Sequence, residues 1–161
     1  MARNEVFIDA PAHAVFDVLA DADAYRDWVP GTRDTGAEAA AFPAEGGSFG
    51  YSAGLPLLGL GDRTTVLATL PPVMLELRIR ATPLISARAT IYLQPQGTGT
   101  RLTLIEEPAS RALTVLIGPA GHALIRLRNV EALRRLRTLV EERLAERRSA
   151  SRRAGGPAVA A

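Results

Sequence analysis

The chain has 161 residues, 47% of them apolar, and a formal net charge of +2. It contains no cysteine, no lysine and only two histidines, which excludes disulfides, thiolate nucleophiles and lysine Schiff bases and leaves too few ligands for a multi-histidine zinc site. It also lacks the run of about 18 apolar residues that a membrane span needs, and it shows no secretory signal. We therefore expect one cytoplasmic domain without a metal, a cofactor or a transmembrane segment.

The charge is divided unevenly along the chain. Residues 1–119 carry nine arginines and thirteen acidic residues, a net charge of −4, whereas residues 120–161 carry ten arginines and four glutamates, a net charge of +6. A basic segment can bind nucleic acid or anionic lipid. No aromatic residue lies among these arginines, as single-strand binding would need, so we interpret them as a solvated helix face and expect no nucleic acid partner.

The first 31 residues predict a strand, a helix and a second short helix. An apolar run at 6–8 indicates the strand, and Pro11 suits the first turn of a helix that extends to about Ala20. Val15, Val18 and Leu19 have the helical spacing of a buried face. Asp21 or Asp23 can cap the second helix, which we expect to end before Pro30.

Alternation of apolar and polar residues then predicts an antiparallel sheet. The expected strands cover about residues 35–41, 48–53, 63–70, 73–80, 85–93 and 101–107, with a hairpin turn at 97–99. In this pattern Arg78, Arg80 and Arg88 point away from the apolar face, so we assign them no role in a site.

The C-terminal part predicts an apolar connector at 108–119, a helix from Ala120 to about Arg147 and a disordered basic tail at 148–161. The tail contains only Ser, Arg, Gly, Pro, Ala and one Val and has no apolar periodicity. We expect a single domain over residues 3–147.

Several segments, in this order, carry a family resemblance. They are Phe7-Ile8-Asp9-Ala10-Pro11, Tyr25-Arg26-Asp27-Trp28-Val29-Pro30-Gly31, Gly99-Thr100-Arg101-Leu102-Thr103, and the helical stretch from Arg128 to Leu136. The chain resembles the polyketide cyclase/dehydrase branch of the START-like (SRPBCC, helix-grip) superfamily. This implies an α+β helix-grip fold: a curved antiparallel sheet of about six or seven strands around a long C-terminal helix, with two short helices after the first strand.

The resemblance also implies a cavity between sheet and helix that takes an apolar ligand, often aromatic, polyketide-like or lipid-like. It does not imply a reaction, because relatives include carriers, receptors and cyclases. We therefore expect non-catalytic binding of a small hydrophobic molecule. The alternative is a polyketide cyclase or dehydratase that uses polar groups in the cavity. The sequence leaves the oligomeric state open.

The long helix suggests where polar groups enter the cavity. At 100° per residue, Leu133, Leu136, Val140 and Leu144 share one face. The same stripe, continued toward the N-terminus of the helix, passes through Asn129, Arg126 and His122. Buried polar groups need partners, so these three bond each other, bond the sheet or bind a ligand.

Glu106 shares the inward side of the last strand with Leu102 and Leu104. It is either an acid or base for catalysis or a structural link to Asn129 or Arg126, and we favour the link. Tyr25 and Trp28 are expected to pack at the corner between helix and sheet. The candidate ligand-binding residues are Glu106, His122, Arg126, Asn129, Leu133 and Tyr51.

Overall fold

The computed structural model describes residues 2–35, 41–53, 61–80, 86–108 and 111–154. Within these ranges the side chains of residues 33–35, 51–53, 61–62, 111–117 and 119–122 lie outside the description. No described helix is both long and apolar enough to cross a membrane.

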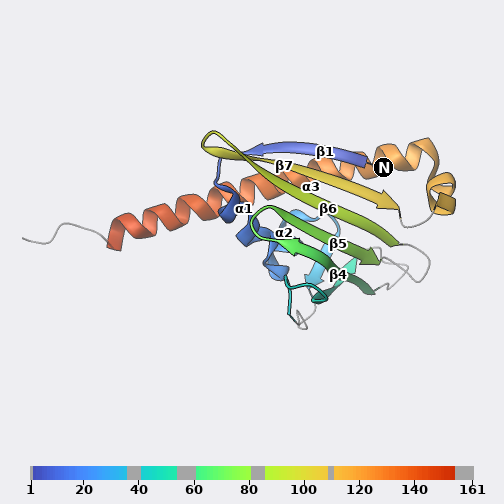
Figure 1. Cartoon of the computed structure of the whole chain (residues 1–161), viewed down its shortest axis with the longest axis horizontal. Helices are drawn as coiled ribbons and strands as arrows, with labels where there is room; N and C mark the ends of the chain where they lie inside the picture. The colour runs from blue at the N-terminus through green and yellow to red at the C-terminus, as the bar shows by residue number, and fades with distance from the viewer. Residues whose placement is uncertain (1, 36–40, 54–60, 81–85, 109–110, 155–161) are drawn as a thin grey trace, which may run out of the picture.

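The described strands form one antiparallel sheet of seven, in the order β1-β7-β6-β5-β4-β3-β2 (Figure 1). The sheet curves over the long helix α3, which confirms the expected α+β helix-grip fold. Its strands are β1 (Ala2–Ile8), β2 (Thr32–Thr35), β3 (Ser48–Ala53), β4 (Gly61–Leu70), β5 (Met74–Arg80), β6 (Ser86–Gln96) and β7 (Gly99–Pro108).

Two short α-helices and one 3-10 turn follow β1, as the sequence predicts. They are α1 (Ala12–Leu19), η1 (Ala22–Ala24) and α2 (Tyr25–Trp28). The Asp21 side chain caps η1 by accepting from the backbone N–H of Asp23 at 3.1 Å. Gly31, with φ +93°, turns the chain directly into β2. The strand therefore lies before the predicted range of 35–41, of which residues 36–40 are outside the described part.

The two faces of the sheet follow the predicted alternation. Leu75 and Leu77 of β5 are buried, whereas Arg78 and Arg80, and Arg88 of β6, are exposed. These arginines therefore face away from the core. The hairpin between β6 and β7 turns at Gly97, whose φ of +59° favours glycine.

Helix α3 (Arg111–Ala154) bends at Gly118, where φ is 61° and ψ is −177°. The break confirms that a new helical segment begins at Gly118-Pro119. Residues 111–117, predicted as a connector, are helical, because their apolar run can form a turn of its own before the glycine. The helix also continues past Arg147 to Ala154, because alanine and arginine are good helix formers even when exposed.

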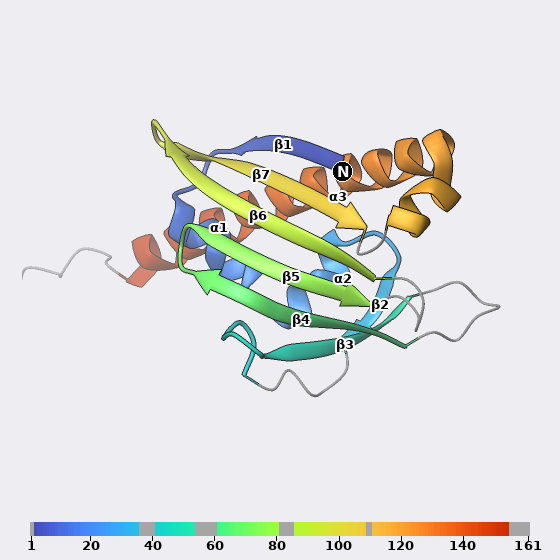
Figure 2. The same cartoon turned by 45° about the vertical axis from the view of Figure 1, so that its right-hand side comes forward.

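The inner side of α3 is the central element of the core (Figure 2). Leu133, Leu136 and Val140 are at most 3% exposed. Two ion pairs tie the far end of the helix to the N-terminal helices: Arg143 to Asp21 at 2.8 Å and Arg147 to Asp17 at 2.9 Å.

We expect Leu136→Ala to lower the free energy of unfolding by about 2–5 kcal/mol, the usual cost of truncating a fully buried leucine. Chemical denaturation measures this change. The exposed neighbour Arg137 is the control, and Arg137→Ala should cost no more than about 0.5 kcal/mol. Equal effects of the two substitutions would contradict the placement of the buried stripe.

We propose that residues 148–161 add nothing to the stability of the domain, since residues 148–154 are all exposed. Truncation after Arg147 keeps both ion pairs and should leave the thermal midpoint unchanged. Truncation after Leu139, which also removes buried Val140, should lower it sharply. If truncation after Arg147 lowered the thermal midpoint by several degrees, this would show that the tail packs on the domain.

Candidate ligand-binding site

A cavity lies between the concave face of the sheet, α2 and the part of α3 from Arg128 to Ala132. The space open to water molecules measures about 60 Å³. One water needs roughly 10–15 Å³ by this measure, so the cavity has room for several waters or for a small ligand. Its sheet wall is mostly apolar, with Leu77, Ile79, Ala89, Ile91 and Leu104, and it also includes Thr32 and Thr64.

Two small residues leave this space open. Ala89 on β6 and Ala132 on α3 both line the cavity and are both 5% exposed. Because an alanine side chain ends at Cβ, neither fills the gap between helix and sheet. Further along α3, Leu136 and Val140 fill the same gap.

The polar end of the cavity is a hydrogen bond between strand and helix. The Asn129 side-chain amide donates from Nδ2 to Glu106 Oε2 at 2.7 Å. Asn129 is 4% exposed and Glu106 is half-buried, and both line the cavity. The bond is the structural link that the sequence favoured. It also fixes a carboxylate, a strong hydrogen-bond acceptor, beside an apolar wall.

Aromatic rings form the wall on the side of α2. The Tyr25 ring lies 4.8 Å from that of Trp28 and 4.7 Å from that of Phe49, between centroids. The Tyr25 hydroxyl donates to the Leu19 carbonyl at 3.0 Å. Burial, and next the charge of Asp21, raise the pKa of this hydroxyl above its usual range, so Tyr25 stays neutral. Its role is structural.

Trp28 differs from Tyr25 in one respect. It lines the cavity and is equally buried, but its indole Nε1 has no hydrogen-bond partner among the residues that the structure describes. The sequence placed both residues at the corner between helix and sheet, and the structure adds that both also face the cavity.

The other predicted site residues are placed as follows. Leu133 is buried in the core beside the cavity. Arg126 is exposed, and its backbone carbonyl accepts from Asn4 Nδ2 at 3.3 Å. The side chains of His122 and Tyr51 lie outside the described residues. The arginine that lines the cavity is Arg128, which periodicity did not select.

The exposure of Arg126 has a simple cause. The first turns of α3 extend past the start of β1 in both views (Figures 1 and 2). Asn129 is the first buried residue among the described side chains of α3, so the helix N-terminal to it has less of the sheet to pack against. Leu124 and Leu127, which precede Asn129, are exposed as well.

A family model described as polyketide cyclase/dehydrase and lipid transport matches residues 2–141. The chain belongs to this family. No curated protein sequence matches it.

Solved structures share the fold of this family member at low sequence identity. Protein CV1439 from Chromobacterium violaceum is 21% identical, with a TM-score of 0.68 over 86% of this chain and 95% of its own. SA2116 from Staphylococcus aureus is 9% identical, with a TM-score of 0.71 over 89% and 94%. DynU16, from the dynemicin biosynthetic locus, is 18% identical, with a TM-score of 0.65 over 87% of this chain and 46% of its own.

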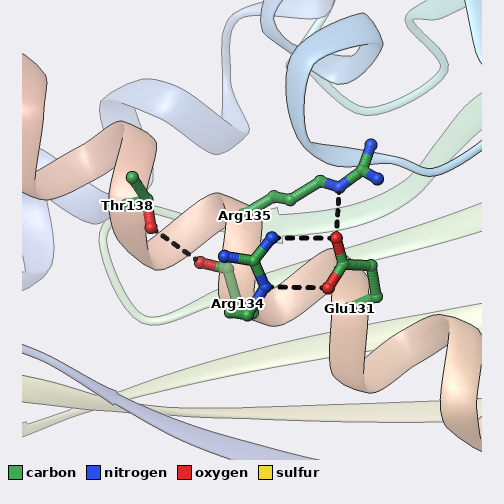
Figure 3. Close-up of polar contacts among 4 residues, drawn as sticks. All are labelled: Glu131, Arg134, Arg135 and Thr138. Carbon is green, nitrogen blue, oxygen red and sulfur yellow. Dashed lines mark hydrogen bonds and ion pairs between the residues drawn. The ribbon is translucent and has the colours of Figure 1, made fainter.

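The α3 segment of this polyketide cyclase/dehydrase family member is braced by polar contacts among Glu131, Arg134, Arg135 and Thr138 (Figure 3). Glu131 accepts from Arg134 Nε at 2.8 Å and from Arg135 Nε at 2.7 Å. Hydrogen bonds from these two arginines hold the pKa of Glu131 at about 2. The arginines are thereby engaged along the helix, and Thr138 donates to the Arg134 carbonyl at 3.2 Å.

The chemistry available in the cavity is limited. Among the described residues no group of three or more His, Asp and Glu side chains could hold a metal ion. Glu106 supplies a carboxylate, Thr32 and Thr64 are hydroxyl residues in the lining, and Arg128 supplies a cation at the exposed edge. A mostly apolar cavity with a few polar groups is the usual form of a small-molecule site.

Proposed function

We propose that the protein binds a small apolar molecule in the cavity between α3 and the sheet, with a polar group of that molecule near Glu106. The observation that carries this is the fixed Glu106–Asn129 pair at the end of a mostly apolar wall. Transfer of an apolar ligand from water into an apolar cavity lowers the free energy. A hydroxyl that donates to the carboxylate would set its orientation, since hydrogen bonds to charged groups are the stronger ones.

Two features support binding over a purely structural interior. The first is the open space at Ala89 and Ala132, where protein cores are otherwise close-packed. The second is the position of Glu106, whose neighbours along the inward side of β7, Leu102 and Leu104, are buried leucines. A carboxylate at that position costs solvation free energy, which a ligand donor would help to offset.

The family name also admits a cyclase or dehydratase, in which Glu106 would move a proton. Such an enzyme needs a second group to stabilise developing negative charge. Asn129 already donates to Glu106, and Arg128 lies at the exposed edge. Binding is therefore the function that the described geometry supports better.

The direct test is a titration with 4-ethylphenol, an apolar ring with one hydroxyl donor, followed by NMR. We expect saturable binding to the parent protein. Ala89→Phe should abolish it, because the added ring fills the cavity. The matched control is Arg88→Phe, which adds the same ring on the exposed side of the same strand. Equal binding by both variants would place the probe elsewhere.

Glu106→Gln extends the same series. If the protein is a binder, removing the charge should weaken the binding of 4-ethylphenol by about 0.5–1.5 kcal/mol, the net value of a hydrogen bond. Ethylbenzene, which lacks the hydroxyl, should bind both forms equally. If Glu106→Gln leaves 4-ethylphenol binding unchanged, Glu106 does not orient the ligand, and its position is explained by the structural link to Asn129 or by proton transfer.

A further inference from the structure

The outer side of α3 is apolar in the part of the helix that extends past β1 (Figure 2). Leu124 and Leu127 are 68% and 67% exposed, the highest values among the large apolar side chains that the structure describes, and Val130 is 52% exposed. The three residues are spaced three apart, so they lie along one side of the helix. We call them the apolar face of α3. Single exposed apolar residues are ordinary, whereas a contiguous group of them is typical of an interaction surface.

The same side of the helix becomes charged directly after the apolar face. Glu131 and Arg134 come next on it and pair with each other at 2.8 Å. One turn later Arg137 pairs with Glu141 at 3.1 Å. These charged turns can remain in water without a partner, and the apolar face is therefore a local feature of α3.

Two exposed arginines flank the apolar face. At 100° per residue, Arg126 lies on one side of it and Arg128 on the other. Neither side chain forms an ion pair or a hydrogen bond with another side chain that the structure describes. Residues 111–130 also contain no Asp or Glu, whereas Arg134 and Arg135 further along the helix both pair with a glutamate. The apolar face is thus bordered by positive charge that no described acidic side chain neutralises.

We propose that the apolar face of α3, with Arg126 and Arg128 at its borders, binds the surface of a membrane that contains anionic lipids. The apolar side chains enter the boundary between headgroups and acyl chains, and the arginines pair with lipid phosphates, as in a basic amphipathic helix that lies on a bilayer. This goes beyond the proposed function and does not depend on it, because the apolar face lies on the side of the helix opposite Asn129.

The distribution of charge favours a membrane over other partners. In a two-fold dimer formed through this face, Arg126 and Arg128 of one copy would lie near the same residues of the other copy, and like charges repel. A single-stranded nucleic acid would find arginines but no ring on which its bases could stack, because residues 111–154 contain no Phe, Tyr or Trp. An anionic membrane supplies both negative charge and an apolar interior.

The test is co-sedimentation of the full chain with vesicles of phosphatidylcholine and phosphatidylglycerol in equal amounts, and with vesicles of phosphatidylcholine alone. We expect the parent protein to bind the mixed vesicles more tightly. Leu124→Gln combined with Leu127→Gln should lower this affinity by about tenfold or more, because two apolar contacts with the membrane are lost. The matched control is Leu70→Gln combined with Val73→Gln, which removes two exposed apolar side chains at the turn between β4 and β5 and should leave the affinity unchanged.

The role of charge is tested with a second pair of variants. Arg126→Gln should weaken binding to the mixed vesicles by about fivefold, the usual effect of one arginine at an anionic surface. Arg152→Gln, which removes an exposed arginine near the far end of α3, should have no effect. All the substituted side chains are exposed, so we expect every variant to fold, and its thermal midpoint checks this.

Several results would overturn the inference. They are failure of the parent protein to bind the mixed vesicles, an equal loss of affinity in the control at Leu70 and Val73, and an equal loss in Arg152→Gln. Sedimentation velocity gives one more: a dimer that the Leu124 and Leu127 substitutions dissociate would assign the apolar face to a second copy of the chain. The same two substitutions should leave 4-ethylphenol binding unchanged, so the membrane surface and the cavity are tested separately.

Discussion

The packing of the inner face of α3 on the concave side of the sheet is the contact on which the rest of this structure depends. Leu136 is fully buried and Val140 nearly so, and strands far apart in sequence meet the same helix. The sheet has one face to cover here: α3 packs on the β1 and β7 side of it, and α1 and α2 contact β6, β7 and β2. Burial of apolar surface supplies the free energy for this arrangement.

The cavity follows from the same contact, because one helix performs two tasks along its length. Large side chains at Leu136 and Val140 close the space between α3 and the sheet. One to two turns earlier, Ala132 and Asn129 leave space and bring a polar group inward. The site is therefore placed on regular elements of the fold, which hold it more rigidly than a surface loop would.

The aromatic cluster links the cavity to the N-terminal helices. Tyr25 contacts Trp28, Phe49 and Phe42, and Asp21 beside it pairs with Arg143 of α3. The wall on the side of α2 is thus tied both to the sheet and to the helix. A ligand that binds at Trp28 would meet a surface that is already ordered, which lowers the entropic cost of binding.

Sequence reasoning found the Glu106–Asn129 pair because both residues lie on regular elements, where the period of a strand or helix fixes the direction of each side chain. It misplaced Arg126 because a period gives an angle around the helix and does not tell where the sheet ends. It did not identify Trp28 as an orphaned donor, because that depends on which acceptors the folded chain brings near the indole. It also ended the helix too early, since exposed alanine and arginine continue a helix without a buried stripe.

The most direct test of a ligand cavity between α3 and the sheet is a crystal structure of the protein with 4-ethylphenol, which carries one hydroxyl on an apolar ring. We expect its ring to lie between Ala89 and Ala132, with the hydroxyl at Glu106. A complex in which the compound binds only on the outer surface, with side chains filling the space at Ala89 and Ala132, would contradict the account.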